Sequence, residues 1–195
     1  LQLDRDESGV HAVQLSMHGR ALLEENDLLL ADIRDRARME EILMRERPAV
    51  VCHAAAHKHV PMMEDNIEDA VTTNVMGTHN VVSLAELHGV ERLVYISTDK
   101  AVDPVNVMGT TKRLGESIVK HAGSRTEKPY LSVRFGNVLG SRGSVVPLFR
   151  EQIGRGGPVT ITVTVADGTT TTDETFTVTV TAANDAGSVS ATHVL

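Results

Sequence analysis

Short apolar runs alternate with longer stretches in which apolar residues recur every three or four positions, up to about residue 157. Short unbroken apolar runs are typical of strands buried on both faces of a parallel sheet, and the longer spacing is typical of helices. Because the two patterns alternate, the sequence predicts an α/β fold with a doubly wound parallel sheet. The predicted strands are Leu1–Asp4, Leu28–Ala31, Ala49–His53, Arg92–Ile96 and Tyr130–Arg134, and the predicted helices are Ser8–Gly19, Arg36–Glu46, Glu64–Gly89, Val107–Ala122 and Val145–Ile153.

The pattern changes toward the C-terminal end, where Lys and Arg vanish and Thr dominates. Strict alternation of β-branched residues there predicts half-buried strands over Val159–Val165 and Thr175–Thr181. Asp167-Gly168 between them is a turn signal, so the two strands form a hairpin or part of a sandwich. We therefore expect an α/β domain over residues 1–157 and a Thr-rich β segment over residues 158–195.

Composition narrows the class of protein. A chain of 195 residues, 41% of them apolar, makes one globular domain or one domain with a small appendage. The net charge of −7 argues against nonspecific nucleic-acid binding, which needs clustered Lys and Arg. The single cysteine, Cys52, excludes an internal disulfide and is expected to be a buried, inert thiol. No apolar run reaches the ~18 residues of a membrane span, and no signal peptide is evident, so we expect a cytoplasmic protein.

Polar residues that follow the predicted strands are the candidates for chemistry, because doubly wound sheets bind ligands at the carboxyl ends of their strands. Asp4 follows the first strand, where a carboxylate can hydrogen-bond a ribose diol or serve as a turn residue or helix cap. Arg5 beside it can take a 2′-phosphate, so the choice between NAD and NADP stays open. Asp32 follows the second strand and can accept a hydrogen bond from an adenine amino group or cap the next helix.

The loop after the third strand, HAAAHKH, combines small and basic side chains. Its alanines allow a ligand to approach the backbone closely. The three histidines suggest a metal, but no carboxylate or cysteine in a defined geometry accompanies them, so we predict no metal site. Lys58 in the same loop can pair with a substrate diphosphate, and a solvated loop lysine is the alternative.

The segment Ser97–Lys100 follows the fourth strand and carries adjacent acidic and basic groups. Asp99 and Lys100 can each act as an acid or a base where the site shifts their pKa values. Met108 and Lys112 lie four residues apart on the next helix, so they share a face, and a lysine there can bind the ribose hydroxyls of a nicotinamide.

The loop after the fifth strand contains an amide and several glycines. Asn137 can hydrogen-bond a sugar or a diphosphate. The glycines on either side of Ser141 allow a tight loop that can cradle a phosphate, although loop flexibility explains them nearly as well.

Seven ordered motifs between about Leu1 and Ile161 resemble one family closely: DRDES, LADIRDRARME, HAAAHKHVPMMEDN, TNVMGTHNV, VYISTDKAVDPVNVMGTTKR, VRFGNVLGSRGSVVPLF and GGPVTIT. They are similar to the CapD-type polysaccharide-biosynthesis proteins, which are extended short-chain dehydrogenases acting as UDP-sugar 4,6-dehydratases or epimerases. The resemblance implies a Rossmann-like fold, NAD or NADP as cofactor and a UDP-sugar as substrate. It leaves the oligomeric state open, and a homo-oligomer is compatible with it.

The resemblance also implies roles for individual residues. Cofactor-binding roles fall on Asp4, Arg5, Asp32, Ile33, Ala54, Ala55, Ala56, Asn74 (structural, near the cofactor) and Lys112, which would hold the ribose. The catalytic segment would comprise Ser97, Thr98, Asp99 as acid, Lys100 as base, Met108 and Lys112, and the UDP-sugar would meet Lys58, Asn137 and Ser141.

Met108 stands where the family usually has a tyrosine. A thioether cannot donate or accept a proton as a phenol does, so the acid and base roles fall on Asp99 and Lys100. A methionine at this position is similar to the large branch of the family, which is anchored at the cytoplasmic face of the inner membrane. The family mechanism oxidises the sugar at C4, removes the C5 proton, expels water from C6 and returns the hydride to C6.

Two departures from the family pattern support alternatives to a dehydratase or epimerase. No glycine-rich phosphate loop precedes Asp4, so we expect a sheet that is incomplete at its N-terminal side and an inactive truncated or chimeric fragment as one alternative. The C-terminal run TVADGTTTTDETFTVTVTAANDAG resembles the end of a cadherin-like or immunoglobulin-like adhesion repeat. A surface adhesion module is the lowest-ranked alternative, because it requires export.

Overall fold

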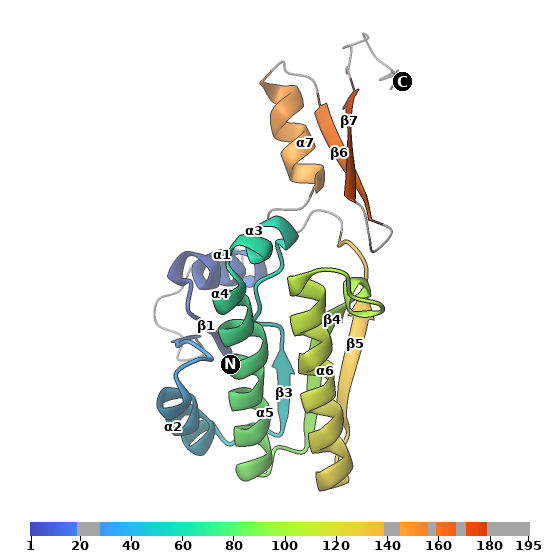
Figure 1. Cartoon of the computed structure of the whole chain (residues 1–195). Helices are drawn as coiled ribbons and strands as arrows, with labels where there is room; N and C mark the ends of the chain where they lie inside the picture. Colours follow the sequence, from blue (N-terminus) through green and yellow to red (C-terminus); the bar gives the residue numbers. More distant parts are fainter. Residues whose placement is uncertain (19–27, 139–144, 156–158, 167–170, 179–195) are drawn as a thin grey trace. The chain divides into compact units, whose positions relative to one another are not determined.

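The computed structural model describes residues 1–18, 28–138, 145–155, 159–166 and 171–178 (Figure 1). They belong to two compact units, Leu1–Gly136 and Asn137–Leu195.

The strands of the first unit agree closely with the predicted ones and pair only in parallel. They form two sheets among the described residues, one in the order β1–β2 and the other in the order β3–β4–β5. The strand bounds are β1 Gln2–Asp4, β2 Leu28–Leu30, β3 Val50–His53, β4 Arg92–Thr98 and β5 Tyr130–Phe135.

The helices between these strands correct the prediction in one region. The single helix predicted over Glu64–Gly89 is wrong, because Asn66 separates a short helix from the rest and its side chain donates a 2.7 Å hydrogen bond to the Met62 carbonyl. The helix α6 also passes its predicted end at Ala122 and stops at a left-handed residue, Glu127. The observed helices are α1 Glu7–His18, α2 Arg36–Glu46, α3 Val60–Asp65, α4 Ile67–Val71, the π-helix η1 Thr72–Gly77, α5 Thr78–Leu87, the 3₁₀ helix η2 Asp99–Ala101 and α6 Val107–Thr126.

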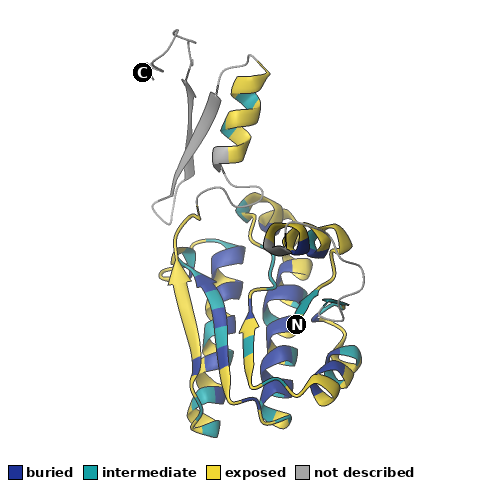
Figure 2. Cartoon of the chain, turned by 180° about the vertical axis from the view of Figure 1, so that it is seen from behind, coloured by how far each residue is buried: buried dark blue, intermediate teal, exposed yellow. Residues whose placement is uncertain are grey.

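The core lies between β4 and the helices α5 and α6, which stand side by side in Figure 1. Leu93 and Tyr95 of β4 are fully buried in it. Gly115 of α6 allows the helix to approach closely, because a Cβ added there would lie 2.4 Å from the Tyr95 hydroxyl. Most of β5 is exposed in the described unit, with Leu131 57% and Phe135 44% accessible (Figure 2).

Cys52 is exposed, so the prediction of a buried thiol is wrong. Neighbouring residues of a strand point to opposite faces, and the next residue, His53, is the one directed into the core. An apolar run without polar alternation does not reveal which of its residues face the core.

The second unit contains a helix and a hairpin. The helix α7 spans Val145–Gly154, and β6 (Val159–Ala166) pairs antiparallel with β7 (Thr171–Val178). The predicted hairpin is confirmed, although β7 begins at Thr171 rather than Thr175. The predicted turn at Asp167-Gly168 lies outside the described residues. In the described parts of both units, no helix has the length and apolar character needed to cross a bilayer.

Candidate active site

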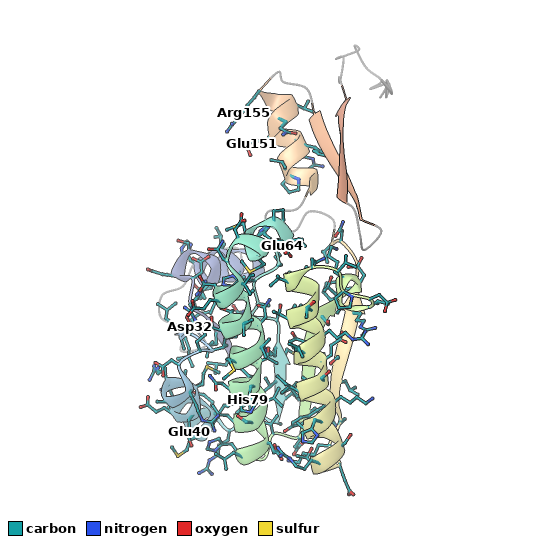
Figure 3. All side chains as sticks on the ribbon, viewed as in Figure 1. Asp32, Glu40, Glu64, His79, Glu151 and Arg155 are labelled. Atoms are coloured by element: carbon teal, nitrogen blue, oxygen red, sulfur yellow. The ribbon has the colours of Figure 1, made fainter. Side chains whose placement is uncertain are left out.

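A pocket lies where the loops after β1, β2 and β3 meet. Its cavity volume is about 170 Å³. Most of the residues proposed to bind the cofactor line this pocket. Asp32, one of them, is labelled in Figure 3. The lining residues are Leu3, Asp4, Arg5, Ala31, Asp32, Ile33, Ala54, Ala55, Ala56, His57 and Thr73.

Asp4 serves as a turn residue and also lines the pocket. Its Oδ1 accepts a 2.9 Å hydrogen bond from the backbone N–H of Asp6, at the start of α1. The neighbouring Arg5 guanidinium lies 3.5 Å from the Asp32 carboxylate, which is the carboxylate that follows the next strand. The pocket therefore brings acidic and basic groups together at the carboxyl ends of β1 and β2.

Asp32 is held by Arg34 and does not cap the next helix. The backbone N–H of Arg34 donates a 2.9 Å bond to Asp32 Oδ1, and its guanidinium donates a 2.6 Å bond to Oδ2. These bonds lower the pKa of Asp32 to about 2, so the carboxylate is ionised at neutral pH. The cap of α2 is Asp35, whose side chain accepts a hydrogen bond from the Arg38 N–H.

Asn74 fixes the loop that follows β3. Its Oδ1 accepts a 2.8 Å bond from the His57 N–H, and its Nδ2 donates to the His57 carbonyl at 3.1 Å and to Thr111 Oγ1 at 3.0 Å. Asn74 is fully buried within the π-helix η1, a rare geometry that is frequent at functional sites. Asn74 thus holds the backbone of His57, a residue that lines the pocket, against Thr111 of α6.

His53 is a buried structural residue. Its Nε2 lies 2.9 Å from Thr78 Oγ1, and the Thr78 hydroxyl itself donates to the Asn74 carbonyl, so Nε2 must be the donor. Burial lowers the pKa of His53 to about 3, which keeps the imidazole neutral. In the described part of the chain, no His, Cys, Asp and Glu side chains are grouped to hold a metal ion.

Asn80 and Thr73 are among the residues at this pocket that sequence reasoning did not assign to it. The Asn80 side chain donates to the backbone carbonyls of Ile33 and Arg34 at 3.0 and 3.3 Å and so fixes the loop after β2. Thr73 lines the pocket from η1. The only signal in the sequence is a polar residue within a helical pattern, which does not distinguish a buried clamp from a surface position.

The segment after β4 forms a compact group around one carboxylate. Asp99 Oδ1 accepts hydrogen bonds from the Thr98 hydroxyl at 2.8 Å, the Lys100 N–H at 2.9 Å and the Lys100 ammonium at 3.1 Å. These bonds, the Thr98 bond first, lower the pKa of Asp99. Asp99 and Lys100 therefore form an accessible ion pair at the carboxyl end of β4.

Lys112 lies behind this segment on α6. It is 6% exposed, and its ammonium donates a 2.7 Å bond to the Ile96 carbonyl and lies 4.7 Å from the centre of the Tyr95 ring. Burial lowers the pKa of Lys112 to about 8. Met108, one turn earlier, is buried in a small cluster with Met63 and is therefore a packing residue. Ser97 is also buried.

Two contacts fix the start of α6 beside the ion pair. Glu64 of α3, labelled in Figure 3, accepts a 2.7 Å hydrogen bond from the Val107 N–H, and Asn106 caps the helix through the Gly109 N–H at 2.7 Å. Gly109 is required at this position, because an added Cβ would lie 2.3 Å from the Lys100 carbonyl oxygen. These contacts fix the Lys100 backbone against the helix that carries Lys112.

The three residues predicted to bind substrate are Lys58, Asn137 and Ser141. Lys58 is an exposed residue of the loop before α3. Asn137 is exposed and belongs to the second unit. Ser141 lies outside the described residues.

The chain belongs to the family described as polysaccharide biosynthesis protein, whose sequence profile matches residues 1–183. The predicted resemblance to CapD-type proteins is thereby confirmed, and the match extends past residue 161. The chain is 47% identical to the probable polysaccharide biosynthesis protein EpsC of Bacillus subtilis over 163 residues, which cover 82% of this chain and 27% of EpsC.

Relatives with named activities are similar over shorter stretches. A UDP-N-acetylglucosamine 4,6-dehydratase (inverting) of Campylobacter jejuni is 39% identical over 139 residues, covering 68% of this chain and 41% of the relative. A UDP-glucose 4-epimerase of Rickettsia canadensis is 48% identical over 115 residues, covering 57% and 34%. The chain thus spans less than half the length of each of these relatives.

Solved structures confirm the Rossmann-like α/β fold. Pen from Bacillus thuringiensis superposes with a TM-score of 0.68 at 36% identity, over 78% of this chain and 46% of that one. A dTDP-4-dehydrorhamnose reductase from Bacillus anthracis in complex with NADP has a TM-score of 0.59 at 26% identity, over 73% of this chain and 56% of that one.

Proposed function

We propose that the chain acts in polysaccharide biosynthesis as a nucleotide-sugar 4,6-dehydratase of the UDP-N-acetylglucosamine type, using NAD or NADP. The observation that carries this proposal is the Asp99–Lys100 ion pair at the end of β4, three residues after the Ile96 carbonyl that accepts the hydrogen bond of the buried Lys112. Dehydration needs a base and an acid near the sugar, and this pair supplies both types of group. The similarity to the Campylobacter dehydratase supports the same reaction.

The pocket at the ends of β1, β2 and β3 fits the adenosine half of a dinucleotide. Its alanines leave room for a ring, and Asp4 offers a carboxylate to the ribose diol. Lys112 would hold the second ribose from α6. Bound NAD or NADP supplies the oxidation at the sugar C4 and the hydride that returns to C6.

The ion pair can perform its proton transfers without a net change. Moving one proton from the Lys100 ammonium to Asp99, across their 3.1 Å contact, gives a neutral amine and a neutral carboxylic acid. Exclusion of water by a bound sugar favours this neutral form. The amine then removes the C5 proton, and the acid gives its proton to the departing C6 hydroxyl, which leaves as water. At this stage both groups are again an ion pair. Oxidation at C4 releases one hydroxyl proton, and return of the hydride to C6 requires one proton at C5, so these two transfers also balance over the cycle.

The product distinguishes this reaction from its alternatives. The chain is incubated with UDP-N-acetylglucosamine and NAD or NADP, and the nucleotide sugar is analysed by mass spectrometry. A 4-keto product lighter by one water is expected. Unchanged substrate, with a full-length relative active in parallel, would refute the proposal and support the inactive-fragment alternative.

Epimerisation is the second candidate, supported by the 48% identity to the Rickettsia epimerase. An epimerase produces an isomer of unchanged mass. The same incubation, followed by chromatographic separation of sugar isomers, therefore distinguishes the two reactions.

A further inference from the structure

Glu116 lies one helical turn after Lys112 on α6, and the side chains of both residues are directed toward the sheet. The Glu116 side chain is only 13% accessible, even though it is a carboxylate. A buried charge requires a partner. That partner is Arg134 of β5, which donates a 2.7 Å bond from Nε to Oε1 and a 2.5 Å bond from Nη2 to Oε2.

The strand register brings this ion pair beside Lys112. Arg134 of β5 is opposite Ser97 of β4, and the residue before Ser97 is Ile96, whose carbonyl accepts the Lys112 bond. Ser97 is itself buried, and after Arg134 its hydroxyl contributes to lowering the pKa of the Glu116 carboxylate. Groups from α6, β4 and β5 thus form one polar cluster at the carboxyl ends of the two strands.

The charges around Lys112 act in opposite directions. Burial disfavours its ammonium, whereas the Glu116 carboxylate favours it. The other titratable groups packed near Lys112 are neutral: burial raises the pKa of Tyr95 to about 12, and burial lowers that of His53 to about 3. Arg134 is positively charged, but it is paired with the Glu116 carboxylate. Among the described groups, Glu116 is the anion that favours the Lys112 ammonium.

We propose that Glu116, fixed by Arg134, is a positioning residue that keeps the Lys112 side chain charged at neutral pH. The consequence for catalysis rests on the proposed function, in which Lys112 holds a ribose. An ammonium donates stronger hydrogen bonds than a neutral amine and adds positive potential beside the reacting carbon. The charge state itself is a property of the chain alone.

The test is the titration of Lys112 in the protein without cofactor or sugar. Acetylation of Lys112 with limiting acetic anhydride is followed by mass spectrometry across a pH series, and the midpoint gives its protonation equilibrium. Glu116→Gln is expected to lower the midpoint by about one pH unit. Glu116→Asp keeps the charge but withdraws it by one methylene, so its midpoint should fall between those of the parent and the Gln variant.

Glu86→Gln is the matched control. Glu86 of α5 accepts a bidentate pair of hydrogen bonds from Arg125 of α6, and neither residue acts on Lys112. This control should leave the Lys112 midpoint unchanged. An unchanged midpoint in Glu116→Gln, or an equal shift in the control, would overturn the proposal. If Glu116→Gln does not fold, an unchanged midpoint in Glu116→Asp would overturn it as well.

This titration and the dehydratase assay can fail separately. A chain that makes no 4-keto product still gives a Lys112 midpoint. Conversely, if the Lys112 midpoint does not change in the Glu116 variants, the proposed acid and base roles of Asp99 and Lys100 are unaffected.

Discussion

The Lys100 ammonium lies 3.1 Å from Oδ1 of Asp99, so the proposed base and the proposed acid form a single ion pair. The Thr98 hydroxyl donates to the same oxygen and fixes the carboxylate at the end of β4. This arrangement explains how proton chemistry can proceed with a methionine at position 108.

Removing either member of the pair should abolish most of the turnover. Asp99→Asn and Lys100→Met are each expected to reduce the rate of product formation by about 10²- to 10⁴-fold, the usual contribution of a general acid or base. Cofactor affinity, measured by calorimetry, should stay within about twofold, because neither residue lines the pocket. Asp103→Asn removes another exposed carboxylate nearby and is the control. Full activity in Lys100→Met would exclude Lys100 as the base.

Asn74 should affect the local stability of the loop after β3 more than the stability of the whole fold. Asn74→Ala removes the acceptor of the His57 N–H and leaves that group without its side-chain partner, at a cost of about 1–3 kcal/mol. Hydrogen exchange should show that protection of the His57 amide is lost. Asn80→Ala, which releases the loop after β2, is the control and should leave the His57 amide protected. Equal loss in both variants would mean that Asn74 acts only through global stability.

Gly115 should tolerate no side chain. In Gly115→Ala the new methyl group would meet the Tyr95 hydroxyl at 2.4 Å, so we expect a loss of about 1–3 kcal/mol in the free energy of unfolding. Adding Tyr95→Phe removes the nearest atom and should restore part of that loss. Urea denaturation measures both effects. Additive destabilisation in the double variant would show that the cost of Gly115→Ala does not come from a clash with the Tyr95 hydroxyl.

Asp32 gives the protein a pH-dependent contribution to stability. Its pKa of about 2 in the folded chain is below the ordinary value of 3.8, so folding favours the ionised form. The contribution is present above about pH 4 and is lost as the pH falls toward 2. Asp32→Asn should therefore be less stable than the parent at pH 7, and the difference should shrink between pH 4 and pH 2. A difference that stays constant over this range would contradict the Arg34 pairing.

Much of the fold was predictable because βα alternation is a strong periodic signal, and the strand positions agree within a few residues. The break at Asn66 and the π-helix were not predictable, because a side-chain bond to a backbone carbonyl interrupts the helix without altering the apolar spacing. The orientation of Cys52 was also hidden, since an unbroken apolar run carries no record of which face is buried.

The candidate site was predictable in part for a similar reason. Asp4, Asp32 and the three alanines lie at the carboxyl ends of strands, where α/β folds bind ligands, so their gathering in one pocket could be expected. The pairing of Glu116 with Arg134 depends on strand register and helix rotation, which no local pattern encodes. The position of Met108 in the motif was recognisable from the resemblance to the family. Its burial against Met63 was not predictable, because it depends on where α3 packs.

The central claim is that the Asp99–Lys100 pair exchanges the C5 proton of a nucleotide sugar. The most direct measurement is conversion of UDP-N-acetylglucosamine in heavy water, followed by mass spectrometry and NMR of the product. The account predicts a product that has lost one water and carries one solvent deuterium on the carbon chain, formed about 10²- to 10⁴-fold more slowly by Lys100→Met. A dehydrated product without solvent deuterium, or deuterium incorporation at the parent rate in Lys100→Met, would contradict it.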